Sequence, residues 1–222
     1  MTDHRSQPAL LPHDQVVRAY TRVAPLYDVW AGLTETRARR ASLSLADVRD
    51  GEAVLEVAVG TGLAFAELVR TNRRGVTEGI DLTDAMLSRA RARVAGLPGR
   101  HRLRTGDARC LDFPDAQFDV VLNSYMLDLL PDDDIATVLG ELRRVLVPGG
   151  RIVLTNMTRS DSAVARVYEW IYRRRPSLVG GCRAIEMTTA VSAAGFIDVK
   201  RETVTQLGVT SEILRARKPE VR

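Results

Sequence analysis

The sequence predicts an α/β fold with a doubly wound, mostly parallel sheet. Between residues 53 and 157, short apolar runs alternate with segments whose apolar residues have helical spacing. The first run, AVLEVAV at 53–59, is apolar at nearly every position, which is typical of a strand buried on both faces. Strands that alternate with helices in this way favour a parallel sheet covered by helices on both sides.

The alternating region is predicted to contain five strands and three helices. The strands are expected at 53–59, 75–82, 102–108, 118–126 and 151–157, and the helices at 63–72, 84–96 and 132–150. The third helix begins with three aspartates at 132–134, which complement the positive end of the helix dipole. We therefore interpret them as helix-start residues and not as metal ligands.

The flanking segments complete the predicted domain. Before the alternation we expect helices at 14–22 and 35–48 with a break at Pro25, preceded by a loosely docked tail. After it we expect helices near 161–174 and 184–195 and strands at 196–204 and 210–218. The last two strands, joined by a turn at Leu207–Gly208, predict an antiparallel hairpin at the edge of the sheet.

Length and composition favour one domain spanning residues 1–222. The chain has 222 residues, 45% of them hydrophobic, which is enough for one sizeable core. No apolar run approaches the roughly 20 residues of a membrane span, and the N-terminus lacks the pattern of a signal peptide. We therefore expect a cytoplasmic protein. Cys110 and Cys182 are expected to be free thiols, and the scattered histidines predict no metal site.

The charge pattern does not favour nucleic-acid binding. The net charge is +4, and 32 basic residues are mixed with 28 acidic ones. Almost all of the basic residues are arginines, and their clusters, such as RRR at 173–175, are short. We interpret most of them as ordinary surface cations. The cluster at 173–175 leaves contact with an anionic acceptor or a membrane surface open.

The stretch LEVAVGTGLAF at 55–65 lies where a doubly wound sheet binds its ligands, after the first strand. A phosphate-binding loop of the Walker type needs a lysine, and none is near. A dinucleotide fingerprint needs a third glycine where this chain has Phe65. What remains is an acid followed by small-x-Gly-x-Gly: Glu56, Ala58, Gly60 and Gly62.

This last pattern resembles the first motif of the class I S-adenosylmethionine-dependent methyltransferases. The resemblance implies that Glu56 holds the cationic methionine end of the cofactor, and that Ala58, Gly60, Thr61 and Gly62 form the loop around it. Glycine permits the backbone to approach a ligand closely. The chain departs from the family pattern at Ala58, where glycine is usual, so we expect a small shift of the loop without loss of binding.

Further positions fit the same family. The resemblance implies that Asp81, at the end of the second strand, binds the ribose hydroxyls and that Leu82 and Met86 pack on the adenine ring. It also implies that Asp107 accepts the adenine amino group and that the backbone of Ala108 reaches the ring. A turn or helix-cap role remains the alternative for both aspartates.

The resemblance spans about residues 16–218 and implies a Rossmann-like, seven-stranded sheet in the order 3-2-1-4-5-7-6. The segment YTRVAPLYDVWAGLTE at 20–35 resembles the ubiquinone/menaquinone biosynthesis methyltransferase group, in which N-terminal helices form a lid. Residues 1–48 are therefore expected to be a tail and lid. Tyr20 is a candidate for the cofactor site and Tyr27 for the catalytic site, with helix packing as the alternative.

The acceptor site is expected beside the fourth strand and within an insert at 158–187. Asn123 is expected to bind the methionine ammonium, and Tyr125 and Asp128 to orient the acceptor. The substrate-binding candidates in the insert share large or charged side chains; they are Tyr168, Tyr172 and Arg183. For each of these, packing or capping is the alternative interpretation.

The sequence therefore predicts an S-adenosylmethionine-dependent methyltransferase that transfers a methyl group by in-line displacement. The acceptor is expected to be a quinol-type compound, a phenolic natural product or a lipid amine, in a monomer or homodimer. The alternatives are a phospholipid N-methyltransferase and a protein that binds the cofactor without catalysis. A nicotinamide oxidoreductase and a nucleic-acid methyltransferase fit less well, because the third glycine is missing and the fourth strand is followed by NSYM.

Overall fold

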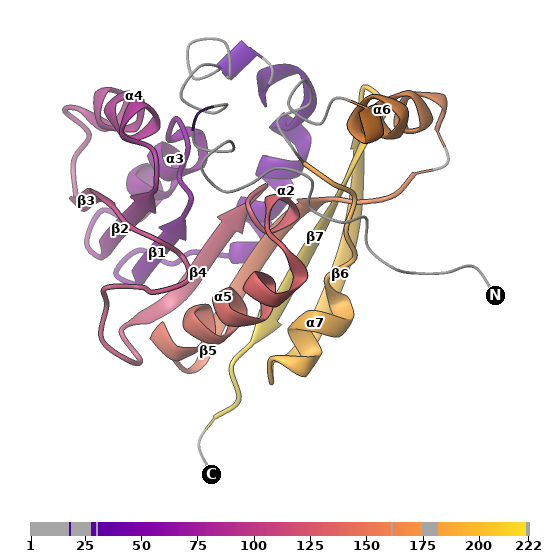
Figure 1. Cartoon of the computed structure of the whole chain (residues 1–222). Helices are drawn as coiled ribbons and strands as arrows, with labels where there is room; N and C mark the ends of the chain where they lie inside the picture. The colour runs from indigo at the N-terminus through magenta and orange to yellow at the C-terminus, as the bar shows by residue number, and fades with distance from the viewer. Residues whose placement is uncertain (1–17, 19–27, 30, 161, 175–181, 221–222) are drawn as a thin grey trace.

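One seven-stranded sheet organises the chain (Figure 1). The computed structural model describes residues 18, 28–29, 31–160, 162–174 and 182–220. The strands are β1 (Ala53–Val57), β2 (Val76–Asp81), β3 (Arg100–Thr105), β4 (Phe118–Ser124), β5 (Leu146–Met157), β6 (Ile197–Gln206) and β7 (Val209–Arg217). Their order, β3-β2-β1-β4-β5-β7-β6, confirms the predicted topology.

Strands β1 to β5 pair in parallel, whereas β7 pairs antiparallel with both β5 and β6. The strand order runs outward from β1 in both directions, through β2 on one side and β4 on the other. The carboxyl ends of these three strands meet at this reversal point, which is where open α/β sheets bind ligands.

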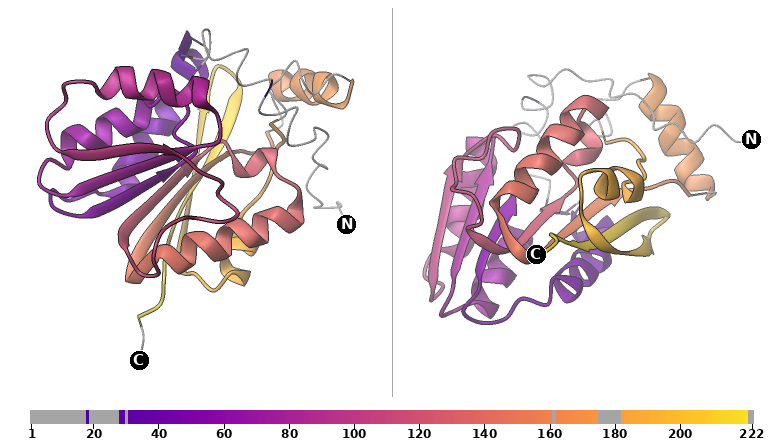
Figure 2. Two further views of the ribbon diagram at one scale, coloured as in Figure 1. Left: turned by 60° about the vertical axis from the view of Figure 1, so that its left-hand side comes forward. Right: turned by 90° about the horizontal axis from the view of Figure 1, so that it is seen from below.

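Helices cover both faces of the sheet (Figure 2). They are α2 (Thr36–Ala46), α3 (Leu63–Thr71), α4 (Asp84–Val94), α5 (Asp132–Val145), α6 (Ala163–Arg174) and α7 (Thr188–Ala193), with a short 3₁₀ helix, η1 (Leu127–Leu129). On one face, α2 and α3 pack on Val54, Val120 and Val153. On the other, α5 and α7 pack on the alternate residues of the same strands.

Four predicted elements differ from the structure by more than two residues at one end. The helix predicted at 132–150 ends at Val145, and residues 146–150 belong to β5, with Leu146 opposite Phe118. Pro148 explains the early end, because a proline disfavours helical conformation in the residue before it. The helix predicted at 184–195 is shortened to α7, since Ile185 donates to the Met157 carbonyl and runs beside the end of β5. The third strand lies at 100–105 and not at 102–108.

The N-terminal predictions can be compared only in part. The helix predicted at 35–48 is α2. The helix predicted at 14–22 and the break at Pro25 lie outside the described residues, apart from Arg18.

Candidate functional site

The loop between β1 and α3 has an unusual backbone. Ala58, Gly60 and Gly62 all take left-handed conformations, with φ angles of 60°, 53° and 80°. A side chain at Gly62 would place its Cβ 2.9 Å from Cα and Cβ of Ala90 in α4, whereas one at Gly60 would meet nothing within 4 Å. The loop therefore packs tightly against α4 at Gly62 and leaves open space at Gly60.

A pocket opens between this loop, α2 and the end of β4. It is lined by Glu35, Arg39, Glu56, Ala58, Val59, Gly60, Thr61, Leu63, Ala64, Ser124 and Tyr125. The structure thus brings together five of the predicted site residues. The sequence analysis missed the two charged residues from the N-terminal side, Glu35 and Arg39. Their spacing of four residues, which puts them on one helical face, was the available signal.

Glu56 is a buried acid inside this pocket. Its side chain is 4% exposed, and its Oε2 has no hydrogen-bond partner among the described residues. Burial, and next the charge of Asp81, raise the pKa of Glu56 to about 8. A buried carboxyl group without a partner is costly, so this atom suits a ligand that brings a positive charge or a donor.

Asp81 joins the end of β2 to the same loop. Its Oδ2 accepts a hydrogen bond of 2.9 Å from the Gly60 N–H, and its Oδ1 accepts one of 2.8 Å from the Thr83 N–H. Burial raises the pKa of Asp81. Each carboxylate oxygen can accept a second hydrogen bond, so Asp81 can hold the loop and a ligand hydroxyl together.

The candidates for the adenine end lie beyond β2 and β3. Leu82 is exposed, whereas Met86 is buried. The Gly106 N–H donates to the Asp81 carbonyl, which brings the following Asp107 close to the end of β2. Asp107 pairs with Arg109, whose Nη2 lies 2.7 Å from its Oδ2. Ala108 is buried in the core.

Thr61 lines the pocket and also contacts the N-terminal segment. Its hydroxyl donates to Asp28 in the N-terminal segment, at 2.5 Å. Arg93 of α4 forms an ion pair with the same Asp28 and donates to the Thr61 carbonyl. These contacts tie the N-terminal segment to the loop after β1. Tyr20 and Tyr27 lie outside the described residues.

Asn123 lies on the opposite face of the sheet from Glu56. Asn123 is opposite Val57 in the β1–β4 pair, and its Nδ2 donates to the Val57 carbonyl at 2.8 Å. Glu56 is opposite Leu122, and neighbouring strand residues alternate between faces. The structure therefore does not bring Asn123 together with Glu56 in one pocket.

Asp128 on η1 is fully buried. Its Oδ2 accepts a hydrogen bond from the Met157 N–H, and its Oδ1 has no partner among the described residues. Burial raises the pKa of Asp128 to about 7. Asn156, which the sequence analysis missed, is fully buried and neither of its side-chain polar atoms has a partner in the described part of the chain. An asparagine in the mostly apolar run IVLTNM was the signal for it.

The other acceptor candidates are held by protein contacts. Tyr125 has a left-handed backbone, and its hydroxyl lies 2.7 Å from Ser211 Oγ; burial raises its pKa. The guanidinium of Arg183 is buried and donates to the Leu130 carbonyl and to Asp132. This position anchors the segment before α7 to the start of α5 and does not turn the guanidinium to solvent.

Tyr168 and Tyr172 lie on the inner side of α6. The Tyr168 hydroxyl donates to the Cys182 carbonyl at 3.1 Å, and burial raises its pKa. Tyr172 is almost completely buried. Tyr168 also lines a second pocket, at the carboxyl end of β5, together with Met157, Arg159 and Glu169.

Comparison with known proteins decides the family. A family model described as a methyltransferase domain matches residues 54–150. The chain is 37% identical over 181 residues to a phosphatidylethanolamine N-methyltransferase of Cereibacter sphaeroides, covering 80% of this chain and 86% of that protein. The chain belongs to the class I S-adenosylmethionine-dependent methyltransferases.

One further relative agrees with this family, and one solved structure agrees with the fold. The chain is 33% identical over 175 residues to a 2-phytyl-1,4-naphtoquinone methyltransferase of Synechococcus elongatus, covering 75% of this chain and 74% of that protein. The crystal structure of the cyclase SpnF superposes with a TM-score of 0.76 at 22% identity, covering 98% of this chain and 100% of that one. At this identity, SpnF supports the fold alone.

The methyltransferase uses S-adenosylmethionine as its cofactor. The pocket residues fit this molecule. The partnerless Glu56 oxygen suits its cationic methionine end, and the Asp81 carboxylate suits ribose hydroxyls. Among the described residues, no helix combines the length and the apolar character needed to cross a bilayer.

Proposed function

We propose that this methyltransferase transfers the methyl group to a lipid acceptor, and that the amine of an ethanolamine phospholipid is the first candidate. The observation that carries this proposal is the second pocket, between the end of β5, α6 and the β6–β7 turn. It combines apolar side chains with one acid, Glu169, and one cation, Arg159. An ethanolamine phosphate headgroup carries one ammonium and one phosphate, which these charges can match. The ammonium must lose its proton before its nitrogen attacks the methyl carbon, so the transfer releases S-adenosylhomocysteine and one proton.

Glu56, Arg39 and Asp81 hold the cofactor in this proposal. Glu56 binds the methionine ammonium, and Arg39, in the same pocket, binds the methionine carboxylate. Asp81 binds the ribose hydroxyls. When bound, S-adenosylmethionine supplies a methyl group that its sulfonium has already activated. The chain then contributes alignment of the reacting atoms, which in well-oriented reactions is worth about 7–11 kcal/mol.

The proposal also assigns residues to the adenine end of the cofactor and to the acceptor. Leu82, Met86, Asp107 and Ala108 enclose the adenine ring. Asp128 is a positioning residue, because its carboxylate fixes the backbone of Met157, which lines the second pocket. Catalytic roles for Tyr125 and Tyr27 and the cofactor contact of Tyr20 stay predictions.

A quinol carbon is the second candidate acceptor. It is supported by the similarity to the 2-phytyl-1,4-naphtoquinone methyltransferase and by the segment at 20–35 that resembles the quinone-methylating group. A quinol and an ethanolamine phospholipid are both lipids, but only the phospholipid headgroup carries a charge pair.

The test is methyl transfer from labelled S-adenosylmethionine to the two acceptors in parallel, followed by mass spectrometry. We expect methylation of phosphatidylethanolamine, and we expect Glu169→Gln to reduce it while Glu202→Gln, an exposed glutamate on β6, does not. Methylation of a reduced naphthoquinone alone would replace the first candidate with the second. Labelling of neither lipid would contradict the proposal.

A further inference from the structure

The outer face of α6 is apolar at its centre. Trp170 and Val167 are each 58% exposed, although most large hydrophobic side chains of the described residues are buried. Tyr168 and Tyr172 lie on the opposite, inner face of the helix. Residues three and four apart share a helical face, so positions 166, 167, 170, 173 and 174 form one continuous outer surface.

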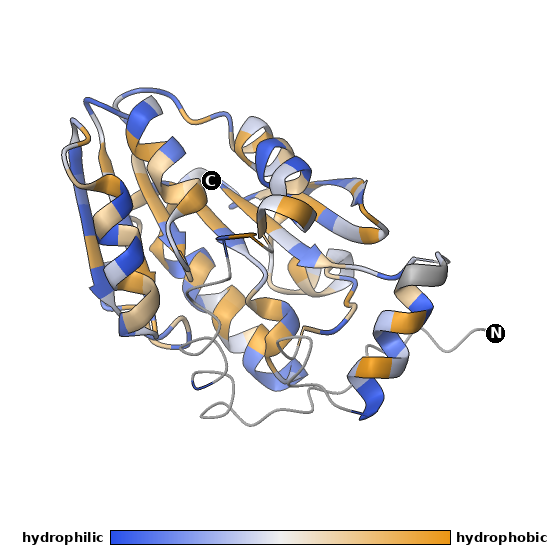
Figure 3. Ribbon diagram, turned by 90° about the horizontal axis from the view of Figure 1, so that it is seen from above, coloured by the Kyte–Doolittle hydropathy of each residue, from blue (hydrophilic) through white to orange (hydrophobic). Residues whose placement is uncertain are grey.

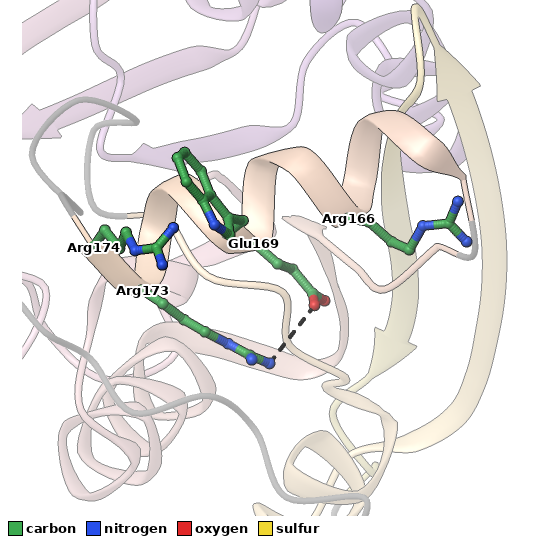
Figure 4. Close-up of a pocket in the computed structure, with 5 residues that line it drawn as sticks. Arg166, Glu169, Arg173 and Arg174 are labelled. Atoms are coloured by element: carbon green, nitrogen blue, oxygen red, sulfur yellow. Dashed lines mark ion pairs between the residues drawn. The ribbon is translucent and has the colours of Figure 1, made fainter.

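Arginines surround this apolar centre. Figure 4 shows Arg166, Arg173 and Arg174 projecting from α6, with Glu169 paired to Arg173 at 3.9 Å. The Arg174 guanidinium lies over the Trp170 ring, 4.4 Å from its centroid. Arginine can extend its apolar stem along such a surface while its charge stays in water. The outer face of α6 therefore combines buriable aromatic surface with excess positive charge.

Other exposed apolar residues lie at the same edge of the sheet. Leu207 in the β6–β7 turn, and Val29 and Leu33 in the N-terminal segment, are all more than half exposed. Ser162, just before α6, donates to the Gly208 carbonyl, and Gln206 donates to the Leu33 carbonyl. Hydrogen bonds thus connect α6, the β6–β7 turn and the N-terminal segment.

These residues make one surface at the carboxyl edge of the parallel strands, where both pockets open. We name it the docking edge; it consists of Val29, Leu33, Arg166, Val167, Trp170, Arg173, Arg174 and Leu207. Five of the seven exposed large hydrophobic residues of the described chain belong to it. Figure 1 shows α6 at the periphery of the molecule, and Figure 3 shows that hydrophobic and hydrophilic residues alternate along it.

We propose that the docking edge binds the surface of an anionic lipid bilayer. Trp170 and Val167 enter the boundary between headgroups and acyl chains, and the arginines contact lipid phosphates. The positive charge selects an anionic surface, and the exposed tryptophan favours an interfacial position. The role of this bilayer as the source of the methyl acceptor rests on the proposed function. Its binding can nevertheless be measured without any methyl transfer.

The test uses Trp170 as a reporter. The chain has two tryptophans, so Trp30→Phe leaves Trp170 as the only one. In this variant we expect a blue shift of the emission with vesicles of phosphatidylcholine and phosphatidylglycerol, and a much smaller shift with phosphatidylcholine alone. Co-sedimentation with the same vesicles measures binding directly.

Charge reversal identifies the surface. Arg173→Glu/Arg174→Glu should weaken co-sedimentation at least tenfold, since each cation at an anionic membrane contributes about fivefold. The matched control is Arg70→Glu/Arg73→Glu, two exposed arginines at and just after the C-terminal end of α3, on the opposite edge of the sheet. The control should bind as the unaltered chain does.

Unchanged thermal melting and cofactor binding would show that both double variants are folded. Absence of a blue shift, or equal weakening by the two double variants, would overturn the docking proposal. Vesicle binding without methylation of any lipid would contradict the proposed function and leave the docking intact.

Discussion

At the scale of single residues, Ala58 explains why glycine is usual at its position. Its φ of 60° lies in the left-handed region, which costs an alanine about 1–2 kcal/mol. The sequence showed the departure from the family pattern, and we expected a shift of the loop. The structure shows an alanine in the conformation that glycine adopts more easily. The loop therefore accepts Ala58 partly through backbone strain.

Ala58→Gly should therefore stabilise the protein by about 0.5–1 kcal/mol, after allowing for the greater unfolded-state entropy of glycine. The measurement is urea unfolding of both forms. Ala92→Gly, the same change at an exposed position inside α4, is the control and should destabilise by about 1 kcal/mol. Destabilisation by both changes would mean that Ala58 carries no strain.

Glu56 predicts a pH dependence of the unliganded enzyme. Its pKa is raised from 4.5 to about 8 by burial, so between these values the folded chain keeps a proton that the unfolded chain has released. The free energy of unfolding must then fall as the pH rises through this window. Asp128, with a pKa raised to about 7, acts in the same direction.

Glu56→Gln should reduce this loss of stability without abolishing it, because Asp128 remains. The measurement is urea unfolding at pH values of about 5 and about 8. Glu202→Gln, at an exposed position, should leave the pH dependence unchanged. If Glu56→Gln and Glu202→Gln behave alike, Glu56 is not a buried proton-binding group.

At the scale of elements, the loop after β1 is held from two sides. Asp81 accepts the Gly60 N–H from β2, and Gly62 fits closely against Ala90 of α4. The Thr61–Asp28–Arg93 contacts add the N-terminal segment. The position of the pocket therefore depends on contacts of the loop with three other segments, which are β2, α4 and the N-terminal segment.

Gly62→Ala should destabilise the protein by about 2–4 kcal/mol, because it combines a left-handed alanine with a Cβ 2.9 Å from Ala90. Gly60→Ala is the matched control. It has the same backbone penalty and no clash, so it should cost only about 1–2 kcal/mol. Thermal or urea unfolding measures both, and equal costs would show that the contact with α4 is not tight.

Features of these elements that neighbouring residues determine could be predicted, and features that distant contacts determine could not. Hydrophobic periodicity located the strands and most helices, because burial of one or both faces produces a pattern of apolar residues within each segment. The opposite faces of Glu56 and Asn123 could not be predicted, since they depend on the register between β1 and β4. The burial of Arg183 likewise depends on contacts with η1 and α5, more than 50 positions away.

At the scale of the whole molecule, the sheet order was predicted through a family resemblance and was confirmed by the structure. The loop residues Glu56, Ala58, Gly60 and Thr61 were predicted together and line one pocket. The charged residues that complete the pocket, Glu35 and Arg39, come from the segment before the sheet. Their four-residue spacing places them on one helical face but does not identify a site, because they reach the pocket only when α2 folds against β5 and β7.

The docking edge also arises only at the scale of the whole molecule. Its residues come from the N-terminal segment, α6 and the β6–β7 turn, and each alone is an ordinary exposed side chain. In our proposal, their common position beside both pockets places the bound membrane surface next to the proposed acceptor site. A lipid acceptor would then reach the enzyme without leaving the bilayer.

The central claim is that the pocket lined by Glu56 and the loop after β1, together with the Asp81 carboxylate that holds this loop at Gly60, binds S-adenosylmethionine. Calorimetric titration with S-adenosylhomocysteine tests it most directly, with NAD titrated in parallel and Asp81→Ala compared with the unaltered chain. We predict binding of S-adenosylhomocysteine and not of NAD, weakened by about 1–3 kcal/mol in Asp81→Ala because buried polar partners lose their hydrogen bonds. Unchanged affinity in Asp81→Ala, or binding of NAD in place of S-adenosylhomocysteine, would contradict the account.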